Sequence, residues 1–317
     1  MNLRNNFDMV YKKFISLTHN FQVTDYYHLF MLLFYTVCAV TFIQSVNSPF
    51  FYISANISLS VMIVVMSVMS NRLRDNRNFK LFQRVIMAPL VYFIYSQVQQ
   101  YIRFINPYEF DSILISCDRF LFGTDPTVWL HKISFPLLTE FLQISYMTYF
   151  LMPLIQGIEL HFKGDDKIFN KFAGLIIFCF YLSYLLYFCM PAIGPRFTLH
   201  DFGLTSLELP GIWITDTLRA IVNQGGGIPA GALNPALYVN RDCMPSGHTM
   251  MTLMNLILAF RLKSKFRWVF LVFGVSLIFG TVYLRYHYVV DVLAGIIFCL
   301  LALWIEPKIS RLLKRKN

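Results

Sequence analysis

Charged residues are scarce in this sequence. Only 14% of the 317 residues are Asp, Glu, Lys or Arg, whereas soluble domains usually contain roughly 25%. Hydrophobic residues make up 56% of the chain, and aromatic residues make up 17%. This composition excludes an ordinary soluble domain and predicts a polytopic membrane protein, because long apolar segments can be buried in lipid as well as in a protein core.

Paired cysteine motifs are also absent. None of the six cysteines forms a CxxC pair, so no zinc site or disulfide framework is indicated. Four of them lie in or beside apolar segments, where cysteine acts as a small hydrophobic residue: Cys38, Cys179, Cys189 and Cys299. Cys117 and Cys243 fall in loops, and a disulfide between them is an alternative only if those loops face an oxidising compartment.

Seven apolar segments have the length needed to cross a bilayer, roughly 20 residues, and an eighth, 82–102, ends in Gln97, Gln99 and Gln100 but is apolar enough to insert with partners. They lie near 26–46, 51–70, 82–102, 134–158, 168–190, 246–263, 266–284 and 287–306. The first ends without a small-x-small cleavage site, which favours an uncleaved anchor over a signal peptide. No internal repeat or low-complexity linker divides the chain. The predicted fold class is therefore all-α, a single polytopic transmembrane helix bundle.

The net charge of +10 is explained by membrane topology rather than by nucleic-acid binding, because no recognisable nucleic-acid motif accompanies the basic residues. Those residues cluster in two short connections and in the C-terminal tail: Arg72, Arg74, Arg77 and Lys80; Arg261, Lys263, Lys265 and Arg267; Lys308, Arg311, Lys314, Arg315 and Lys316. In an eight-span chain these clusters share one side, which the positive-inside rule makes cytoplasmic. A seven-span chain would place the first cluster opposite the other two.

Arg4, Lys12 and Lys13 join the cytoplasmic clusters in this topology, so both termini are expected in the cytoplasm. The loops 103–133 and 191–245 then lie outside. We expect a multi-pass protein of the cell (inner) membrane, with these loops on the periplasmic or extracellular face. The sequence FDSILISCDRFLFGTDPTVWLHKI is too interrupted to span the bilayer and predicts short helices at the interface. The sequence NQGGGIPAGALNPALYVNRD is rich in glycine and proline, and we expect it to carry the entrance to a site.

Three polar motifs interrupt the apolar segments. GPR places Arg196 after the fifth span, PSGHT places Ser246, Gly247 and His248 at the start of the sixth, and RYHYVVD lies between the seventh and the eighth. Because successive spans alternate in direction, all three motifs are expected at the same outer boundary of the membrane.

Two histidines and one acid in these motifs suggest distinct chemical roles. His287 and Asp291 are four residues apart, which places them on one face of a helix. A carboxylate there can hold one imidazole nitrogen as N–H and leave the lone pair of the other nitrogen free as a nucleophile. His248 supplies a second imidazole, suited to protonate a leaving oxygen. An acid at the start of an apolar segment is costly without a partner, which favours a functional pairing.

Positive groups surround the three side chains. Arg196 and Arg285 carry planar guanidinium groups that bind phosphoryl oxygens, and the N–H groups near Ser246 and Gly247 form a helix N-terminus that favours an anion. Together these residues predict phosphoryl transfer through a phosphohistidine, which requires neither a metal nor a cofactor. Taken singly, each has a structural alternative, since a histidine at a span end can be an interfacial anchor and an arginine can snorkel.

The motifs GPR, PSGHT and HYVVDVLAG, in this order and at these intervals, resemble the three signature regions of the type 2 phosphatidic acid phosphatase superfamily of integral membrane enzymes. The resemblance covers about residues 80–306. It implies a six-helix phosphatase-like core with two additional N-terminal spans. The implied organisation is an N-terminal anchor over 1–80, the core over 81–306 and a basic cytoplasmic tail over 307–317. It also implies roles for the site residues: His287 as nucleophile, Asp291 as its orienting partner, His248 as general acid, and Ser246, Gly247 and Arg196 as phosphate ligands.

The sequence departs from the phosphatase pattern at two motifs. The family's first motif is Lys-x6-Arg-Pro, but here Cys189 precedes the arginine by seven residues and Phe197 follows it. The family's third motif begins with Ser-Arg, and Gly280 and Thr281 stand at those positions. Two expected cations are therefore missing, and Arg285 is the candidate replacement.

The departures resemble a second branch, the inositol phosphorylceramide and sphingomyelin synthases, which pass the phosphoryl-bearing group to an alcohol instead of water. DRFLFGTDPTVWL is similar to the segment that precedes the core in that branch, whereas PSGHT is more phosphatase-like. A lipid phosphate or phospholipid is the expected substrate in either case, and the acceptor stays open. A non-catalytic lipid-binding or transport protein with the same fold is the alternative of another class, and vanadate-dependent oxidation is a third. The sequence assigns no oligomeric state.

Overall fold

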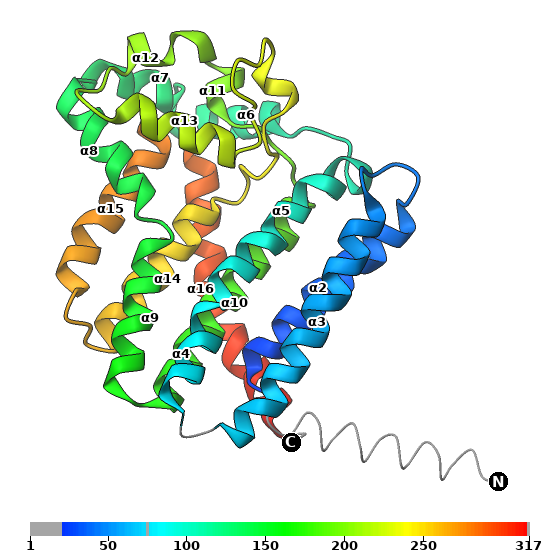
Figure 1. The fold of residues 1–317 in the computed structure, drawn as a ribbon. Helices are drawn as coiled ribbons and strands as arrows, with labels where there is room; N and C mark the ends of the chain where they lie inside the picture. Colours follow the sequence, from blue (N-terminus) through cyan, green and yellow to red (C-terminus); the bar gives the residue numbers. More distant parts are fainter. Residues whose placement is uncertain (1–20, 74–75, 316–317) are drawn as a thin grey trace.

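The computed structural model describes residues 21–73 and 76–315, and every regular element within them is a helix. Long helices lie side by side, and short helices cover one end of the bundle (Figure 1). The long helices are α2 (Val23–Thr41), α3 (Pro49–Arg72), α5 (Met87–Ile105), α10 (Asp166–Tyr187), α14 (Gly247–Arg261), α15 (Arg267–Tyr283) and α16 (Val289–Arg315). α5 continues the shorter helix α4 (Arg77–Val85), and the two form one rod. A second rod of two helices consists of α8 (Pro136–Met147) followed by α9 (Leu151–Lys163).

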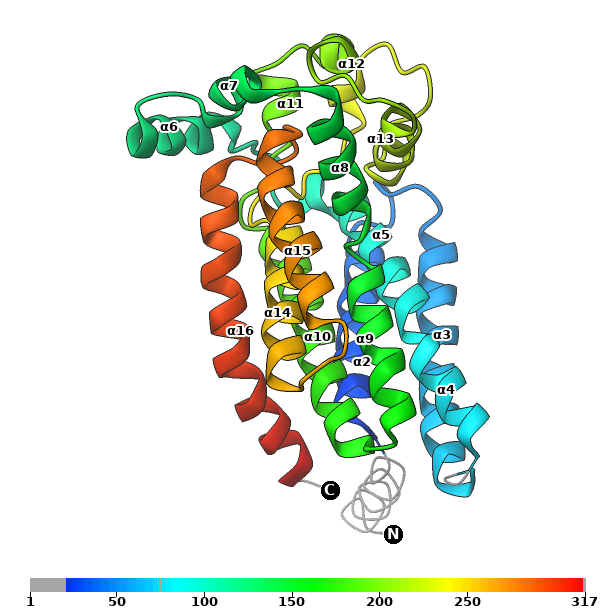
Figure 2. The ribbon, with the colours of Figure 1, turned by 90° about the vertical axis from the view of Figure 1, so that its left-hand side faces the viewer.

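The short helices that cover one end of the bundle form a cap. The cap is built from the two long loops that the sequence predicts to lie outside the membrane. Its helices are α6 (Asp111–Phe122), α7 (Pro126–Leu130), α11 (Pro195–Thr198), α12 (Thr205–Glu208) and α13 (Thr215–Gly225). Three short 3-10 helices join them: η1 (His131–Ile133), η2 (Phe202–Leu204) and η3 (Pro235–Leu237). The view turned by 90° shows α6 above the end of α16, which it contacts (Figure 2). The predicted short helices over 110–133 are therefore present.

Five helices among the described residues are long and apolar enough to cross a membrane: Val23–Thr41, Pro49–Ser70, Arg77–Ile105, Asp166–Tyr187 and Val289–Lys314. The helix Arg267–Tyr283 is apolar but shorter. The chain is therefore a polytopic helical membrane protein, as its composition predicts.

Two predicted spans, 82–102 and 134–158, are each interrupted rather than continuous. The first is divided between α4 and α5 at Ile86, and the second breaks over 148–150. Each break lies three or four residues before a proline, Pro89 or Pro153. Proline has no N–H to donate to the carbonyl four residues earlier, so an uninterrupted helical ladder is impossible there.

The N-terminal helices are not equally peripheral. α2 packs against α5 and α10 as well as α3, and it buries Met31, Leu32 and Tyr35 completely. α3 leaves most of its surface outside the bundle. At the other end of the chain, α16 continues through Pro307 to Arg315, so most of the expected basic tail is helical. The basic residues Arg4, Lys12, Lys13, Arg74 and Lys316, on which part of the predicted topology rests, lie outside the described residues.

Candidate active site

The three sequence motifs meet beneath the cap through main-chain hydrogen bonds. The N–H of Arg196 donates to the carbonyl of Arg285 at 3.1 Å, and the N–H of Ser246 donates to the carbonyl of Asp291 at 3.0 Å. The N–H of Cys243 donates to the carbonyl of Ala192 at 3.2 Å. Segments nearly a hundred residues apart are thereby held in one place, as the sequence predicts from the alternation of the spans.

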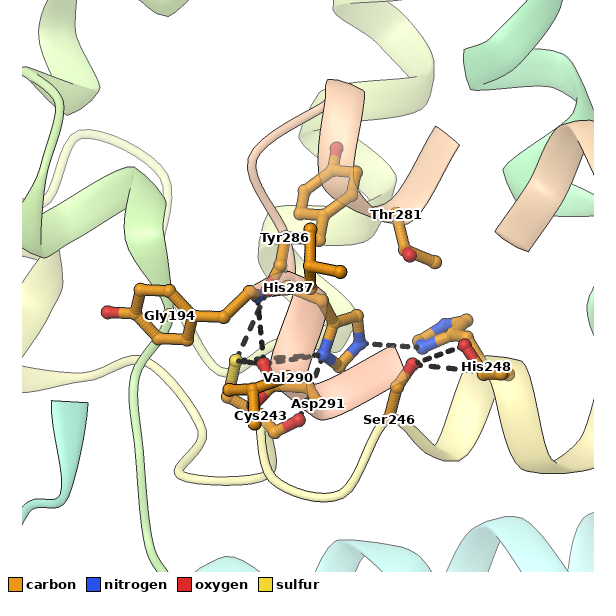
Figure 3. Close-up of polar contacts among 12 residues, drawn as sticks. Gly194, Cys243, Ser246, His248, Thr281, Tyr286, His287, Val290 and Asp291 are labelled. Atoms are coloured by element: carbon orange, nitrogen blue, oxygen red, sulfur yellow. Dashed lines mark hydrogen bonds and ion pairs between the residues drawn. The ribbon is translucent and has the colours of Figure 1, made fainter. Parts of the chain in front are cut away.

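His287 is fixed by a main-chain carbonyl as well as by the predicted acid. Its Nδ1 lies 2.9 Å from the carbonyl oxygen of Cys243 and 3.5 Å from Oδ2 of Asp291 (Figure 3). A carbonyl oxygen can only accept a hydrogen bond, so Nδ1 must carry the proton. The neutral ring then has its lone pair on Nε2. The nitrogen that carries the lone pair is therefore the one that faces the second histidine.

Asp291 is completely buried and holds several groups at once. Its Oδ2 accepts hydrogen bonds from the main-chain N–H of Tyr288 and from the thiol of Cys243, both at 2.9 Å. Its Oδ1 has no hydrogen-bond partner among the described residues. Its contact with His287 is longer than the contact of the Cys243 carbonyl, so the carboxylate acts on the ring together with the main chain.

His248 lies beside His287 and is held between two aromatic rings. Its Nδ1 is 3.4 Å from Nε2 of His287. The ring centroids of Tyr146 and Tyr149 lie 4.4 Å and 4.3 Å from that of His248. Tyr146 lies in the last turn of α8 and Tyr149 lies within the break before α9, so the end of α8 and the interruption of the rod place two aromatic rings against the second imidazole.

Ser246 and Gly247 form the start of α14. The hydroxyl of Ser246 accepts a hydrogen bond from the N–H of Thr249 at 3.2 Å and caps the helix. A side chain at Gly247 would begin 2.2 Å from the hydroxyl of Tyr187, so only glycine fits without a shift of that tyrosine. The first N–H groups of a helix have no partner within the helix, and they point toward its N-terminus. Here that N-terminus begins beside the two imidazoles.

Arg196 is separated from His248 by aromatic rings. Its Nη1 donates to Oδ1 of Asn223 at 2.8 Å, and its guanidinium lies 5.0 Å from the ring centroid of Tyr286. The ring of Tyr286 is 4.5 Å from that of Tyr146, which contacts His248. A row of rings therefore connects the arginine to the histidine pair, and Asn223 is the only hydrogen-bond partner of the guanidinium among the described residues.

Arg285 is placed differently from the phosphate ligand that the sequence suggests. Its side chain is only 1% exposed, and its guanidinium forms an ion pair with Glu208 of α12. This hydrogen bond lowers the pKa of Glu208, which keeps the pair ionised at neutral pH. Arg285 has a positive φ of 66° in the turn between α15 and α16. The structure thus brings His248, His287 and Asp291 together but uses Arg285 to fasten the cap.

Several residues that hold the site are not evident from the motifs. On α6, Asp111 accepts from the N–H groups of Ile193 and Gly194, at 3.0 and 2.8 Å. Asp118 of the same helix accepts from the N–H groups of Val289 and Val290, at 2.9 and 2.8 Å. The acids of α6 therefore hold the first motif and the start of α16. Their only signal in the sequence is the presence of acidic residues in an otherwise apolar interfacial segment.

Cys243 is another residue of the site whose contribution the motifs do not reveal. It is a free, buried thiol, and Cys117 is also free. The thiol, Nδ1 of His287 and a carboxylate oxygen of Asp291 lie within 4.8 Å of one another. Sulfur, imidazole and carboxylate are zinc ligands, so this group has the donors to hold such an ion if their protons are displaced. Hydrogen bonds within the group satisfy these donors without one.

The fold and the geometry of the site define a class: a polytopic membrane protein with two adjacent histidines beneath a cap of short helices. The profile of the PAP2 superfamily matches residues 113–305, more than half of the chain, and the chain belongs to that superfamily. Membership implies phosphatase or phosphotransferase activity.

Two curated relatives are similar at low identity. A phosphoinositol dihydroceramide synthase of Bacteroides thetaiotaomicron is 24% identical over 248 residues, which cover 70% of this chain and 76% of that protein. A PA-phosphatase related-family protein of Dictyostelium discoideum is 24% identical over 197 residues, which cover 56% of this chain and 33% of that protein. The chain thus spans about a third of the length of the Dictyostelium protein. No solved structure gives a significant match.

Proposed function

We propose that this protein cleaves a phosphate ester of a membrane lipid through a phosphohistidine on His287 and passes the phosphoryl-bearing group to water or to an alcohol. One observation carries the proposal. Nδ1 of His287 faces the Cys243 carbonyl, so the free lone pair is on Nε2, beside His248. A nucleophile and a proton donor are thereby adjacent without competing for the same nitrogen.

In the first step the Nε2 lone pair forms a bond to phosphorus, and the bond between phosphorus and the lipid oxygen breaks. His248, in its protonated form, gives its proton to that leaving oxygen. The phosphorylated ring of His287 becomes cationic. The Cys243 carbonyl and the Asp291 carboxylate, both on the Nδ1 side, stabilise that charge.

In the second step neutral His248 takes a proton from the acceptor, whose oxygen attacks phosphorus and releases His287. The N-terminus of α14 and the unpaired N–H groups of Arg196 are the groups that would stabilise negative charge on the phosphoryl oxygens. Arg196 can reach the phosphoryl oxygens only if the ring of Tyr286 moves, because that ring lies between the guanidinium and Tyr146. Arg285 has no assigned role in the proposed chemistry, since its Nη1 is paired with Glu208 of the cap.

The proposed orientation places the cap and the histidines outside and both termini in the cytoplasm, with eight spans that comprise two N-terminal helices and a six-helix core. The positions of the basic residues support it, because Arg77 and Lys80 lie in the first turn of α4 while Lys263 and Lys265 lie between α14 and α15. Both segments lie at the end of the bundle opposite the cap (Figure 1).

Transfer to an alcohol is the second candidate. It is favoured by the similarity to the Bacteroides synthase over 70% of the chain and by the GPR form of the first motif. In this case a phospholipid donates its phospho-headgroup to His287, and the hydroxyl of a second lipid, such as a ceramide, accepts it.

The test is to incubate purified protein in nanodiscs with phosphatidic acid or with phosphatidylinositol, each with and without a ceramide and with and without free inositol. Released phosphate and new lipids are followed by mass spectrometry. Free phosphate from phosphatidic acid alone means a hydrolase, and a new headgroup-bearing lipid that requires the acceptor means a transferase. The His287→Ala protein is the control for contaminating activity. Lipid binding without either product would favour the non-catalytic alternative.

A further inference from the structure

A polar cavity lies between α2, α3, α4 and α10, at the end of the bundle opposite the cap, and has no part in the proposed chemistry. Its volume is about 370 Å³. Its walls include Asp25, His28, Ser67, Lys80, Arg84 and Asp166. We infer that this cavity binds the headgroup of a phospholipid from the adjacent leaflet, one with a phosphate and at least one hydroxyl group.

The phosphate would meet two cations that share a single carboxylate. Nζ of Lys80 lies 2.7 Å from Oδ2 of Asp166, and Nη2 of Arg84 lies 2.5 Å from Oδ1 of the same residue. Arg84 is further fixed by the ring of Phe169, whose centroid lies 3.9 Å from its guanidinium carbon. Because Asp25 is a second acid of the cavity, the phosphate would be held by the N–H donors that Lys80 and Arg84 keep beside their contacts with Asp166 rather than by an excess of charge. A preformed guanidinium favours phosphate oxygens.

The opposite wall contains a polar group without a partner. His28 is only 2% exposed, and its Nδ1 lies 2.5 Å from the hydroxyl of Tyr181. Its Nε2 has no hydrogen-bond partner among the described residues. An unpaired polar atom inside a membrane bundle is costly, because neither lipid nor apolar side chains can satisfy it. A ligand hydroxyl satisfies either tautomer of this ring, since it can donate or accept.

An apolar groove adjoins the cavity and favours a lipid over a soluble phosphate. The groove has a volume of about 410 Å³, lies between α4, α5, α9 and α10, and is lined almost entirely by aliphatic and aromatic side chains. Arg84, Met87 and Phe169 form a wall common to the cavity and the groove. A ligand with a polar headgroup and an acyl chain can therefore occupy both sides of this wall, whereas a soluble phosphate would use the cavity alone.

The inference is tested by thermal unfolding of the purified full-length protein in detergent with short-chain lipids. The probes are dioctanoyl phosphatidylglycerol, dioctanoyl phosphatidylcholine, whose headgroup lacks hydroxyl groups, and free glycerol 1-phosphate. A ligand that binds the native state raises the unfolding temperature in a concentration-dependent way. We expect the largest rise with phosphatidylglycerol, a smaller one with phosphatidylcholine and none with glycerol 1-phosphate at the same concentration.

Two variants assign the rise to this cavity. Lys80→Gln should weaken the apparent affinity for phosphatidylglycerol about tenfold, because a charge-assisted contact with the phosphate is lost. Ser67→Met should abolish the rise by filling the cavity. Lys265→Gln, which removes an exposed cation at the same end of the bundle but outside the cavity, is the matched control and should leave the affinity unchanged.

Turnover by the Lys80→Gln protein should equal that of the wild type. Lys80 lies on α4, at the end of the bundle opposite the cap (Figure 1), whereas His248 lies in the first turn of α14, beneath the cap. An equal loss of affinity in Lys80→Gln and Lys265→Gln would mean nonspecific attraction to basic residues and would overturn the inference. A rise that persists in both Lys80→Gln and Ser67→Met would place the lipid elsewhere. An equal effect of glycerol 1-phosphate would identify a soluble phosphate rather than a lipid as the ligand.

Discussion

The contacts of single side chains suit the two histidines to the different roles proposed for them. His287 is held at Nδ1 by a main-chain oxygen, whereas His248 is held by the faces of two tyrosine rings and leaves its nitrogens less constrained. A ring with one fixed N–H suits a nucleophile, because its lone pair is held on the opposite nitrogen. A ring that packing alone restrains can gain and lose a proton during the reaction.

His248→Ala tests the role of proton donor. The variant keeps the nucleophile, so turnover of a lipid substrate should fall by about 10²- to 10⁴-fold rather than vanish. The loss should be smallest for a nitrophenyl phosphate ester, whose leaving group needs no proton. Steady-state rates with the two substrates measure this difference. An equal loss with both substrates would contradict the assignment of His248 as general acid.

Variants at Cys243 and Asp291 distinguish the contribution of the main-chain carbonyl to kcat from that of the carboxylate. Cys243→Ala removes the thiol but retains the carbonyl that fixes the His287 tautomer, so kcat should stay within about threefold of wild type, as expected for loss of one weak hydrogen bond. Asp291→Asn should lower kcat further, because the amide cannot neutralise the cationic phosphorylated ring.

A Cys243→Ala protein that is as impaired as Asp291→Asn would show that the thiol, not the carbonyl, holds the ring. Unfolding temperatures of both proteins control for loss of structure.

At this scale the sequence indicates the catalytic set but not its surroundings. The spacing of His287 and Asp291 is local, so helical geometry alone brings them together. The side chain of Arg285 is not determined by its neighbours in sequence, because its partner Glu208 lies 77 residues away in the cap. The tyrosines around His248 are likewise contributed by a different rod, and nothing in their local pattern distinguishes them from ordinary core aromatics.

Among the helices, α6 connects the cap to the catalytic segment. Asp118 accepts from two N–H groups in the first turn of α16, directly after His287, and so acts as a cap supplied by another helix. The first motif is held by Asp111 of the same helix. The position of α6 across the end of α16 therefore bears directly on the geometry of the nucleophile (Figure 2).

Asp118→Ala should leave the first N–H groups of α16 without their acceptors and lower the stability by roughly 1 kcal/mol, the usual effect of a lost helix cap. It should also lower kcat, since His287 precedes those groups by two residues. The matched control is Asp125→Ala, which removes an acid of the same region whose partner is the exposed Arg119. Such exposed pairs contribute little. Similar unfolding temperatures and rates for the two variants would refute the capping role of Asp118.

The sequence predicts where the rods lie more reliably than whether they are continuous. Hydrophobicity extends through 82–102 and 134–158, so the segments read as single spans, whereas the missing N–H groups of Pro89 and Pro153 divide each rod in two. The break in the second rod bears on the candidate site, because Tyr146 at the end of α8 and Tyr149 within the break contact His248. That consequence depends on the packing of α8 and α9 against α14, which no local pattern reveals.

For the molecule as a whole, the proposed topology is testable with single cysteines in a protein whose accessible native cysteines, Cys117 and Cys189, are replaced by serine. In intact cells Leu233→Cys, in the exposed outer loop, should react with a membrane-impermeant maleimide. Lys265→Cys, between α14 and α15, should react only after permeabilisation. The reverse pattern would invert the protein in the membrane and move the histidines to the cytoplasmic face.

The most direct test of the central claim is to trap the phosphorylated enzyme. Purified protein is mixed with a ³²P-labelled lipid substrate, quenched at alkaline pH, where phosphohistidine survives, and analysed by peptide mass spectrometry. The account predicts an acid-labile phosphate on His287, retained in His248→Ala and absent together with all turnover in His287→Ala. Phosphate on His248, or full activity in His287→Ala, would contradict it.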